Sequence, residues 1–323
     1  MKISLQKLYE KYYGSYGIPA FNVFTAEQVM GVFKGANKAE LPIIIAITPA
    51  ARNYISHEML QAMISAAAIL YPNVEFSVHL DHGNIDHCIN AINSGFYDSV
   101  MIDASHETFE NNISITSEIV NRAHEKGIAV EAELGVLSGV EDNINVSEFN
   151  SRFTDPDQAS EFIKRTNCDS LAVAIGTSHG AYKLQNVDGL QFNILEKINN
   201  NQFGFPIVLH GASNVSKSEI IRINDVGGKL QNSAKGIEIE QIRRAIKLGI
   251  SKINIATDLR LLWTRVHREF FMETPELFDP TIPGEKYINE ISKLVYIKCI
   301  SFFLGNNLDA LFINTNNIMD YND

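Results

Sequence analysis

Three histidines in this sequence stand at the same kind of position, after an apolar run of strand length and directly before a glycine. They are His82 in HLDHG, His179 in AIGTSHG and His210 in IVLHG. Neutral imidazole is a favoured ligand for zinc, and a catalytic zinc site takes three protein ligands and leaves one position open. A single histidine at a strand end is more often a hydrogen-bonded core residue, but its recurrence in three similar runs predicts a shared metal site.

Carboxylates accompany these histidines. Asp81 precedes His82 directly, so the regular alternation of a strand predicts that it points to the other side. We therefore interpret Asp81 as a general base beside the metal rather than as a ligand. Asp103 and Glu133 end two further apolar runs, where they could orient the ligand histidines or hold a second cation. Buried carboxylates paired with lysines are the alternative interpretation for these two residues.

Apolar runs of strand length alternate with stretches of helical period along almost the whole chain, which predicts parallel strands joined by helices. About eight such units are present, as in a (β/α)8 barrel. A doubly wound open sheet is the alternative. Polar residues cluster after strands that are spread along the whole chain, which favours the barrel, because barrel enzymes build their sites at the carboxyl ends of all their strands. The predicted strands are Ile18–Asn22, Pro42–Ile47, Val74–Leu80, Ser99–Asp103, Ala129–Leu134, Ser170–Gly176, Pro206–Leu209 and Lys252–Ala256.

Helices are predicted between these strands. Several end in a glycine just before the next strand, at Gly95, Gly127 and Gly249, where a left-handed cap is expected. The predicted helices include Ala26–Ala39, His57–Ala68, Ile85–Ser94, Glu110–Lys126, Asp157–Thr166 and Ile239–Leu248.

The alternation predicts one barrel domain over residues 1–305 and a short tail, rich in Asn and Asp, over residues 306–323. One segment interrupts the pattern. Leu137–Asp157 is polar and about twenty residues long, and loops longer than about 12–15 residues without their own structure are often lids. We interpret this segment as a lid over the site.

Composition excludes several classes of protein. The 323 residues are 45% hydrophobic and 20% charged, close to the soluble average. The net charge of -11 argues against general nucleic-acid binding, which requires a basic face. The three cysteines are scattered and no secretory signal is recognisable, so a reducing, cytoplasmic location is expected. The most apolar windows are too short to span a bilayer.

Phosphate binding is indicated at the ends of the last two strands. Gly211–Ser213 lies at the end of strand seven and Asn254–Thr257 at the end of strand eight, where many barrels bind phosphate through backbone N–H groups. Gly180 and Lys183, after strand six, could contribute to the same site.

Six segments together resemble the class II, metal-dependent ketose-bisphosphate aldolases. The likeness runs over about residues 16–305 and rests on these segments, which occur in order: HLDHG at 79–83, SVMIDASH at 99–106, VEAELG at 130–135, AVAIGTSHGAYK at 172–183, VLHGAS at 208–213 and KINIATDLR at 252–260. The resemblance implies reversible cleavage of fructose 1,6-bisphosphate or tagatose 1,6-bisphosphate to dihydroxyacetone phosphate and glyceraldehyde 3-phosphate.

The resemblance also assigns roles by position. It implies one Zn²⁺ on His82, His179 and His210, and Asp81 as the acid or base at the C4 hydroxyl. It places the phosphate of the dihydroxyacetone half, with a monovalent cation (Na⁺ or K⁺) nearby, around Gly180, Lys183, Gly211, Ser213, Asn254 and Thr257.

Further roles concern the segment Leu137–Asp157 and the far end of the substrate. The resemblance implies that Glu141 exchanges the proton of the dihydroxyacetone half. Arg260 matches a residue that reaches the far phosphate in the neighbouring subunit, which implies a homodimer or a higher homo-oligomer. Asn22 and Thr48 are expected to contact the substrate as well.

Two departures leave the sugar open. Ala256 stands where many fructose-bisphosphate members carry Asp, and alanine is a feature of tagatose-bisphosphate members. Residues 48–52, TPAAR, also differ from the commoner pattern near the far phosphate. Another phosphorylated ketose and a degenerate, sugar-phosphate-binding barrel remain alternatives. A metal-dependent barrel hydrolase is less favoured, because the first strand lacks His-x-His.

Overall fold

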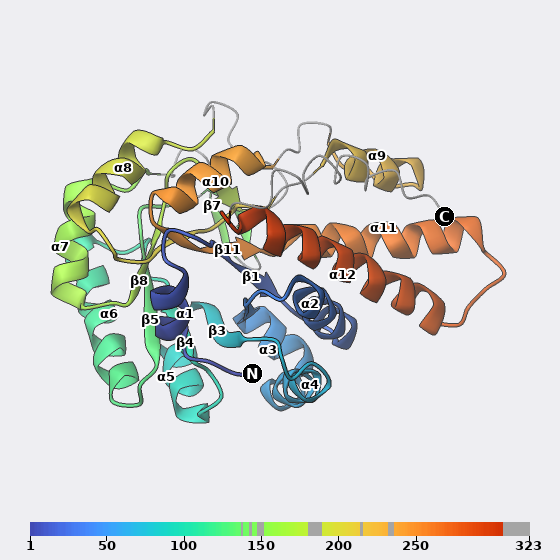
Figure 1. Cartoon of the computed structure of the whole chain (residues 1–323), viewed down its shortest axis with the longest axis horizontal. Coiled ribbons are helices and arrows are strands. Elements are labelled where there is room, and N and C mark those ends of the chain that lie inside the picture. The colour runs from blue at the N-terminus through green and yellow to red at the C-terminus, as the bar shows by residue number, and fades with distance from the viewer. Residues whose placement is uncertain are drawn as a thin grey trace.

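The computed structural model describes residues 1–136, 138–141, 144–146, 152–179, 189–213, 216–231 and 236–305, with only the backbone for 138–141, 144–146 and 179. Eight parallel strands close into a barrel in the order β1-β11-β10-β8-β5-β4-β3-β2. Helices connect and surround them (Figure 1). The predicted (β/α)8 barrel is confirmed, and the open sheet is excluded. The barrel strands are β1 Ile18–Asn22, β2 Ile43–Ile47, β3 Phe76–Gly83, β4 Ser99–Ile102, β5 Ala129–Leu134, β8 Ser170–Val173, β10 Ile207–Leu209 and β11 Ile250–Ile255.

The six predicted helices are all present, with ends that differ by a few residues at most. They are α2 Ala26–Ala39, α4 His57–Leu70, α5 Ile85–Ser94, α6 Phe109–His124, α7 Pro156–Thr166 and α10 Ile239–Lys247. Gly95, Gly127 and Gly249 have positive φ, as the predicted caps require. The structure adds α1 Leu5–Tyr12, α3 Pro49–Ile55, α8 Phe192–Asn201, α9 Lys217–Asp225, α11 Thr257–Glu273 and α12 Thr281–Phe302.

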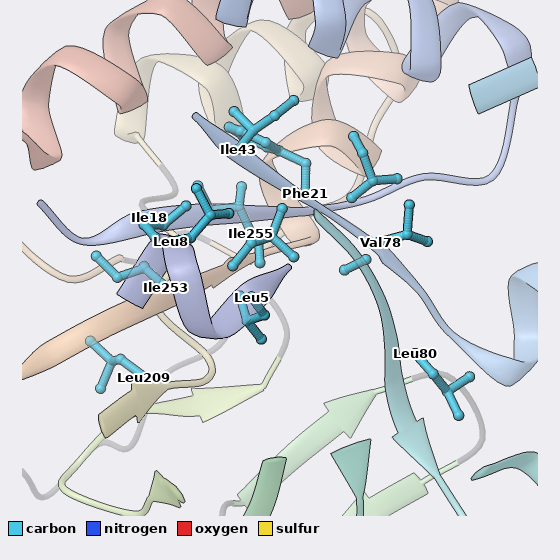
Figure 2. Packing of buried hydrophobic residues seen from close by; sticks show 14 of the residues in the cluster. Leu5, Leu8, Ile18, Phe21, Ile43, Val78, Leu80, Leu209, Ile253 and Ile255 are labelled. Carbon is cyan, nitrogen blue, oxygen red and sulfur yellow. The ribbon is translucent and has the colours of Figure 1, made fainter. Parts of the chain in front are cut away.

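The hydrophobic core joins both faces of the barrel wall. Every residue of β1, β2, β4 and β5 is buried, because helices cover a parallel sheet on one side and barrel side chains fill the other. Leu5 and Leu8 of α1 are fully buried and belong to the same cluster as Ile18 of β1. Figure 2 shows this packing together with residues of β3, β10 and β11.

Helices α11 and α12 run side by side and extend away from the barrel as an arm (Figure 1). The inner part of α12 packs closely on α2. Gly31 and Gly35 permit this approach, since a Cβ at Gly35 would stand 2.6 Å from both the Ser292 carbonyl oxygen and Cβ of Val295. The arm therefore has its base anchored on the first crossover helix of the barrel.

The segment 137–157 is not devoid of structure, and that part of the prediction is wrong. It contains β6 Ser138–Glu141 and β7 Ile144–Val146, which pair antiparallel. The other edge of β6 pairs in parallel with the short strand β9, Ser178–His179. This small sheet places the start of the long segment beside the backbone of a predicted metal ligand.

Candidate active site

Strand β3 delivers two neighbouring side chains to the barrel mouth. His82 has φ of 51°, an uncommon value for a residue other than glycine, and the pairing with β4 shifts register between Leu80 and Gly83. This bulge breaks the alternation of the strand. Ligand atoms of Asp81, His82 and His210 consequently lie within 4.8 Å of one another. The prediction that Asp81 points away from His82 is therefore wrong, because it assumed a regular strand.

Each of these two histidines is held by a carboxylate on one ring nitrogen. Nδ1 of His82 lies 2.9 Å from Oδ2 of Asp103, and Nε2 of His210 lies 2.8 Å from Oε1 of Glu131. Burial alone would raise the pKa of both carboxyls, but the hydrogen bonds and nearby positive charges hold the pKa of each well below its usual value. An ionised carboxylate only accepts, so Nδ1 of His82 and Nε2 of His210 carry the ring protons.

The other two ring nitrogens face each other. Nε2 of His82 and Nδ1 of His210 are 3.0 Å apart, and the rings meet edge to face with centroids 4.7 Å apart. In neutral rings both of these nitrogens are acceptors, and two acceptors at this distance repel unless a cation joins them. Burial lowers the pKa of His210, which opposes a further proton. The two nitrogens therefore fit a metal ion. In many metal sites a carboxylate orients each imidazole ligand through its other ring nitrogen, as here.

A buried ionic network lies below this pair in the barrel interior. Glu131 accepts a hydrogen bond from Nζ of Lys252 at 2.8 Å, and Lys252 lies 3.1 Å from Nε2 of His79. Burial and the charge of Lys252 lower the pKa of His79 to about 3, so this ring is neutral. Sequence reasoning missed Glu131 and Lys252. The signal was present in VEAELG, where Glu131 and Glu133 share parity and both face inward.

Asp81 is fully buried, and its carboxylate accepts hydrogen bonds from two side-chain amides, one on β1 and one on β11. Nδ2 of Asn22 donates to its Oδ2 at 2.8 Å, and Nδ2 of Asn254 donates to its Oδ1 at 3.0 Å. Both predicted substrate residues thus contact Asp81. Within the described part of the chain, Oδ1 of neither asparagine has a hydrogen-bond partner, so each is a buried acceptor that is left unsatisfied.

His179 is brought close to this group through its backbone, while its side chain lies outside the described residues. Gly211 has φ of 61°, and a Cβ there would stand 2.5 Å from the carbonyl oxygen of Ser178. The residue after His210 thus packs on the residue before His179. This close approach explains the glycine that follows His210. His179 lies six residues beyond the end of β8, since that strand ends at Val173 and not at Gly176 as predicted.

The remaining predicted residues that the structure describes lie at or just after the carboxyl ends of barrel strands. Asp103 forms a second candidate metal group with His82 and Glu133. Thr48 is buried and its hydroxyl caps α3 by accepting from the Ala51 N–H at 3.2 Å. Ser213 is buried, Thr257 begins α11, and the exposed Arg260 lies over the ring of Phe24 at 5.0 Å. Gly180, Lys183 and the side chain of Glu141 lie outside the described residues.

Comparison with known proteins decides the family. Residues 3–306 match the family model described as fructose-bisphosphate aldolase class-II. The chain belongs to this family. The predicted class II aldolase, a lyase that cleaves a carbon–carbon bond, is therefore confirmed at the level of the family.

Individual relatives of this aldolase agree. The fructose-bisphosphate aldolase of Giardia intestinalis is 40% identical over 281 residues, covering 85% of each chain. That of Helicobacter pylori is 40% identical over 269 residues, covering 82% of this chain and 85% of the relative. The crystal structure of the YdjI aldolase from Escherichia coli K12 superposes with a TM-score of 0.73 at 31% identity, covering 94% of this chain and 97% of that one. Among the described residues, no helix combines the length and apolar character needed to cross a membrane.

Proposed function

We propose that this aldolase catalyses the metal-dependent, reversible cleavage of a ketose 1,6-bisphosphate to dihydroxyacetone phosphate and glyceraldehyde 3-phosphate. The observation that carries the proposal is the pair of ring nitrogens of His82 and His210, 3.0 Å apart, each turned inward by a carboxylate on the opposite nitrogen. The relatives named fructose-bisphosphate aldolase support this choice of substrate.

Zn²⁺ is the metal that we propose, held by His82, His210 and His179. A bound Zn²⁺ would act as a Lewis acid that polarises the substrate carbonyl next to the bond that breaks. Asp103 and Glu131 would keep the two described ligands in the required tautomer. We place the near phosphate around Gly180, Lys183, Gly211, Ser213, Asn254 and Thr257, with Na⁺ or K⁺ beside it.

Asp81 is the proposed acid or base at the C4 hydroxyl. In the cleavage direction its carboxylate would take the hydroxyl proton, and in the synthetic direction return it. The amides of Asn22 and Asn254 fix its orientation from β1 and β11. Their unpartnered oxygens are suited to accept hydrogen bonds from substrate hydroxyls. Glu141, on β6, would exchange the proton of the dihydroxyacetone half when the segment 137–157 covers the site.

We further propose a homodimer, in which Arg260 serves the far phosphate in the neighbouring subunit, with Thr48 close to the same phosphate. Arg260 is exposed on α11, at the base of the arm. Farther along the arm, several large apolar side chains are exposed, and contiguous exposed apolar surface marks interaction sites. These residues are Trp263, Phe271, Met272, Leu277, Phe278 and Ile282.

The choice of sugar is tested by a side-by-side assay of fructose 1,6-bisphosphate and tagatose 1,6-bisphosphate, with release of dihydroxyacetone phosphate as the readout. We expect turnover of at least one, and a preference for tagatose 1,6-bisphosphate or weak discrimination because of Ala256. Binding of both without release of either product would indicate a degenerate barrel. Turnover of neither bisphosphate, with cleavage of another phosphorylated ketose, would correct the substrate within the same family.

A further inference from the structure

Helix α9 packs mainly on α11, and the two helices lie alongside each other (Figure 1). The buried apolar residues of α9, Ile220 and Ile223, form a small cluster with Leu261 of α11 that is separate from the main hydrophobic core. Hydrophobic burial is not directional, and three side chains provide little of it. Polar contacts between the two helices should therefore decide how α9 is oriented.

Arg265 of α11 is only 2% exposed and contacts carboxylates on three helices. Its Nε donates to Oε1 of Glu219, on α9, at 2.8 Å. Its Nη1 donates to Glu269, on α11, at 3.1 Å, and its Nη2 donates to Glu290, on α12, at 2.8 Å. Arg222 of α9 adds a second connection, because its guanidinium donates to both oxygens of Glu269. A guanidinium presents its donors in a rigid planar fork, so these contacts fix the placement of α9 relative to α11 and α12.

The chain that leaves the active site leads directly into α9. His210 follows β10, and its neighbour Gly211 packs against the backbone of Ser178. Ser213 is buried, and Ser216, the N-cap of α9, comes three positions later, which the chain can span over at most about 11 Å. A helix fixed this close along the chain therefore limits the positions open to Gly211 and Ser213.

We propose that Arg265 is a positioning residue, which holds α9 against α11 through Glu219 and thereby fixes the segment Gly211–Ser213 next to His210. Helix α11 begins at Thr257, two residues after β11, and β11 pairs with β10. Arg265 thus joins the segments that follow two neighbouring strands. Both segments contain residues proposed above to hold the near phosphate, so this role rests on the proposed function. Displacement of Gly211–Ser213 would weaken phosphate binding without removing a group that takes part in the reaction.

Substitution of the carboxylates tests this role, because loss of Arg265 itself would leave several acids without their buried cation. Glu219→Ala removes the contact of Arg265 with α9. Glu290→Ala is the matched control, since it removes an equally short contact with α12, and each variant leaves Arg265 two carboxylates.

For Glu219→Ala we expect the Kd of dihydroxyacetone phosphate and the KM of the ketose 1,6-bisphosphate to rise about 10-fold, since misplacement of a binding group by about 1 Å can cost up to about 10²-fold. The value of kcat should stay close to that of wild type, as expected when only binding is weakened. Glu290→Ala should change none of these values. Glu219→Gln keeps an acceptor oxygen for Arg265 and should recover part of the lost affinity. Calorimetric titration and steady-state kinetics measure these quantities.

Amide hydrogen exchange gives a readout that needs no substrate. The amides of α9 and of Gly211–Ser213 should exchange faster in Glu219→Ala than in wild type, and at the wild-type rate in Glu290→Ala. Unchanged affinity in Glu219→Ala would overturn the proposal, whatever its melting temperature, and so would an equal loss of affinity in Glu290→Ala. A wild type that neither binds dihydroxyacetone phosphate nor cleaves a ketose bisphosphate would refute the proposed function. Equal exchange in both variants would then still refute the role of Arg265.

Discussion

The nitrogen with which each histidine faces its neighbour is fixed by the carboxylate on the other nitrogen. Asp103 turns Nε2 of His82 inward, and Glu131 turns Nδ1 of His210 inward. A site assembled in this way has little freedom to rearrange, because both carboxylates are themselves held, Asp103 by Ser105 and Glu131 by Lys252. A substitution that removes an inward nitrogen should therefore cause loss of the metal ion and not a shift of the metal ion within the site.

Metal binding and acid–base work are expected to separate at two neighbouring side chains. His210→Ala should purify with much less zinc than wild type, because it removes a ligand. Asp81→Ala should keep its zinc, since Asn22 and Asn254 already occupy the carboxylate, yet lose kcat by a factor on the order of 10²–10⁴. Metal content by atomic emission and kcat are the two measurements. A folded Asp81→Ala protein without zinc would make Asp81 a ligand, an outcome that its place within 4.8 Å of both histidines gives a physical basis.

Selectivity between sugars is a second matter for single residues. Ala256 directly follows β11 and stands two positions after Asn254, whose amide reaches Asp81. An aspartate at 256 could accept a hydrogen bond from a hydroxyl in one configuration, and a site built on such a bond discriminates against the epimer. Ala256→Asp should shift the ratio of kcat/KM toward fructose 1,6-bisphosphate by about 10-fold or more, which corresponds to about 1.4 kcal/mol. A ratio that does not move would place discrimination elsewhere, near Thr48 and Arg52.

At the scale of the element, the bulge in β3 shows where sequence reasoning stops. The run predicted a strand that ends at Leu80, with alternating sides for Asp81 and His82, and it correctly placed both at the mouth. It could not predict φ of 51° at His82, because a histidine rarely adopts it and the following Gly83 is the residue that the rules would choose. The conformation depends on pairing with β4, which is a tertiary property.

The prediction that the long segment after β5 has no structure of its own was wrong for a related reason. Strands β6, β7 and β9 are only two to four residues long, too short for an alternation pattern to register. The pairing of β6 with β9 joins residues that are about forty positions apart in sequence, such as Ser138 and Ser178. The assignment of this segment as a lid stays a prediction.

Packing between α2 and α12 gives an element-scale prediction. Gly35→Ala should lower the free energy of unfolding by about 1–3 kcal/mol, because the added methyl would meet the backbone of Ser292 and the side chain of Val295. Gly284→Ala, on α12, is the matched control, since a Cβ there meets nothing within 4 Å. Alanine should raise stability there by up to about 1 kcal/mol through helix propensity. Denaturant unfolding of both variants measures the difference, and equal effects would show that α2 and α12 do not constrain each other.

At the scale of the whole molecule, the barrel was predictable because apolar runs of strand length alternate with stretches of helical period along almost the whole chain. The arm was not, because nothing in the amphipathic pattern of residues 257–302 says that part of the two helices leaves the barrel. Phe271 is 60% exposed and Phe278 is 92% exposed. Apolar exposure on this scale is a property of the folded arrangement and cannot be read from a periodic sequence.

The arm predicts the oligomeric state. Phe271→Asp should weaken self-association, so that the variant sediments as a monomer at micromolar concentrations at which wild type sediments as a dimer. Ile69→Asp is the control, since Ile69 is equally apolar and 79% exposed but lies on α4, away from the arm. A wild-type protein that sediments as a monomer throughout, with full activity, would contradict the dimer and the role of Arg260.

The central claim is that a divalent metal at His82, His179 and His210 activates the substrate, and not a lysine. Lys252 makes the distinction necessary because it is buried beside His79 in the barrel interior, but its ammonium is paired with Glu131 at 2.8 Å, which disfavours attack on a carbonyl. The most direct measurement is cleavage of ketose 1,6-bisphosphate by enzyme from which metal has been removed by chelation, with metal content verified. Activity should be lost, return on addition of zinc, and leave no covalent adduct after borohydride treatment. Full activity in verified metal-free enzyme, or borohydride trapping of substrate on Lys252, would contradict the account.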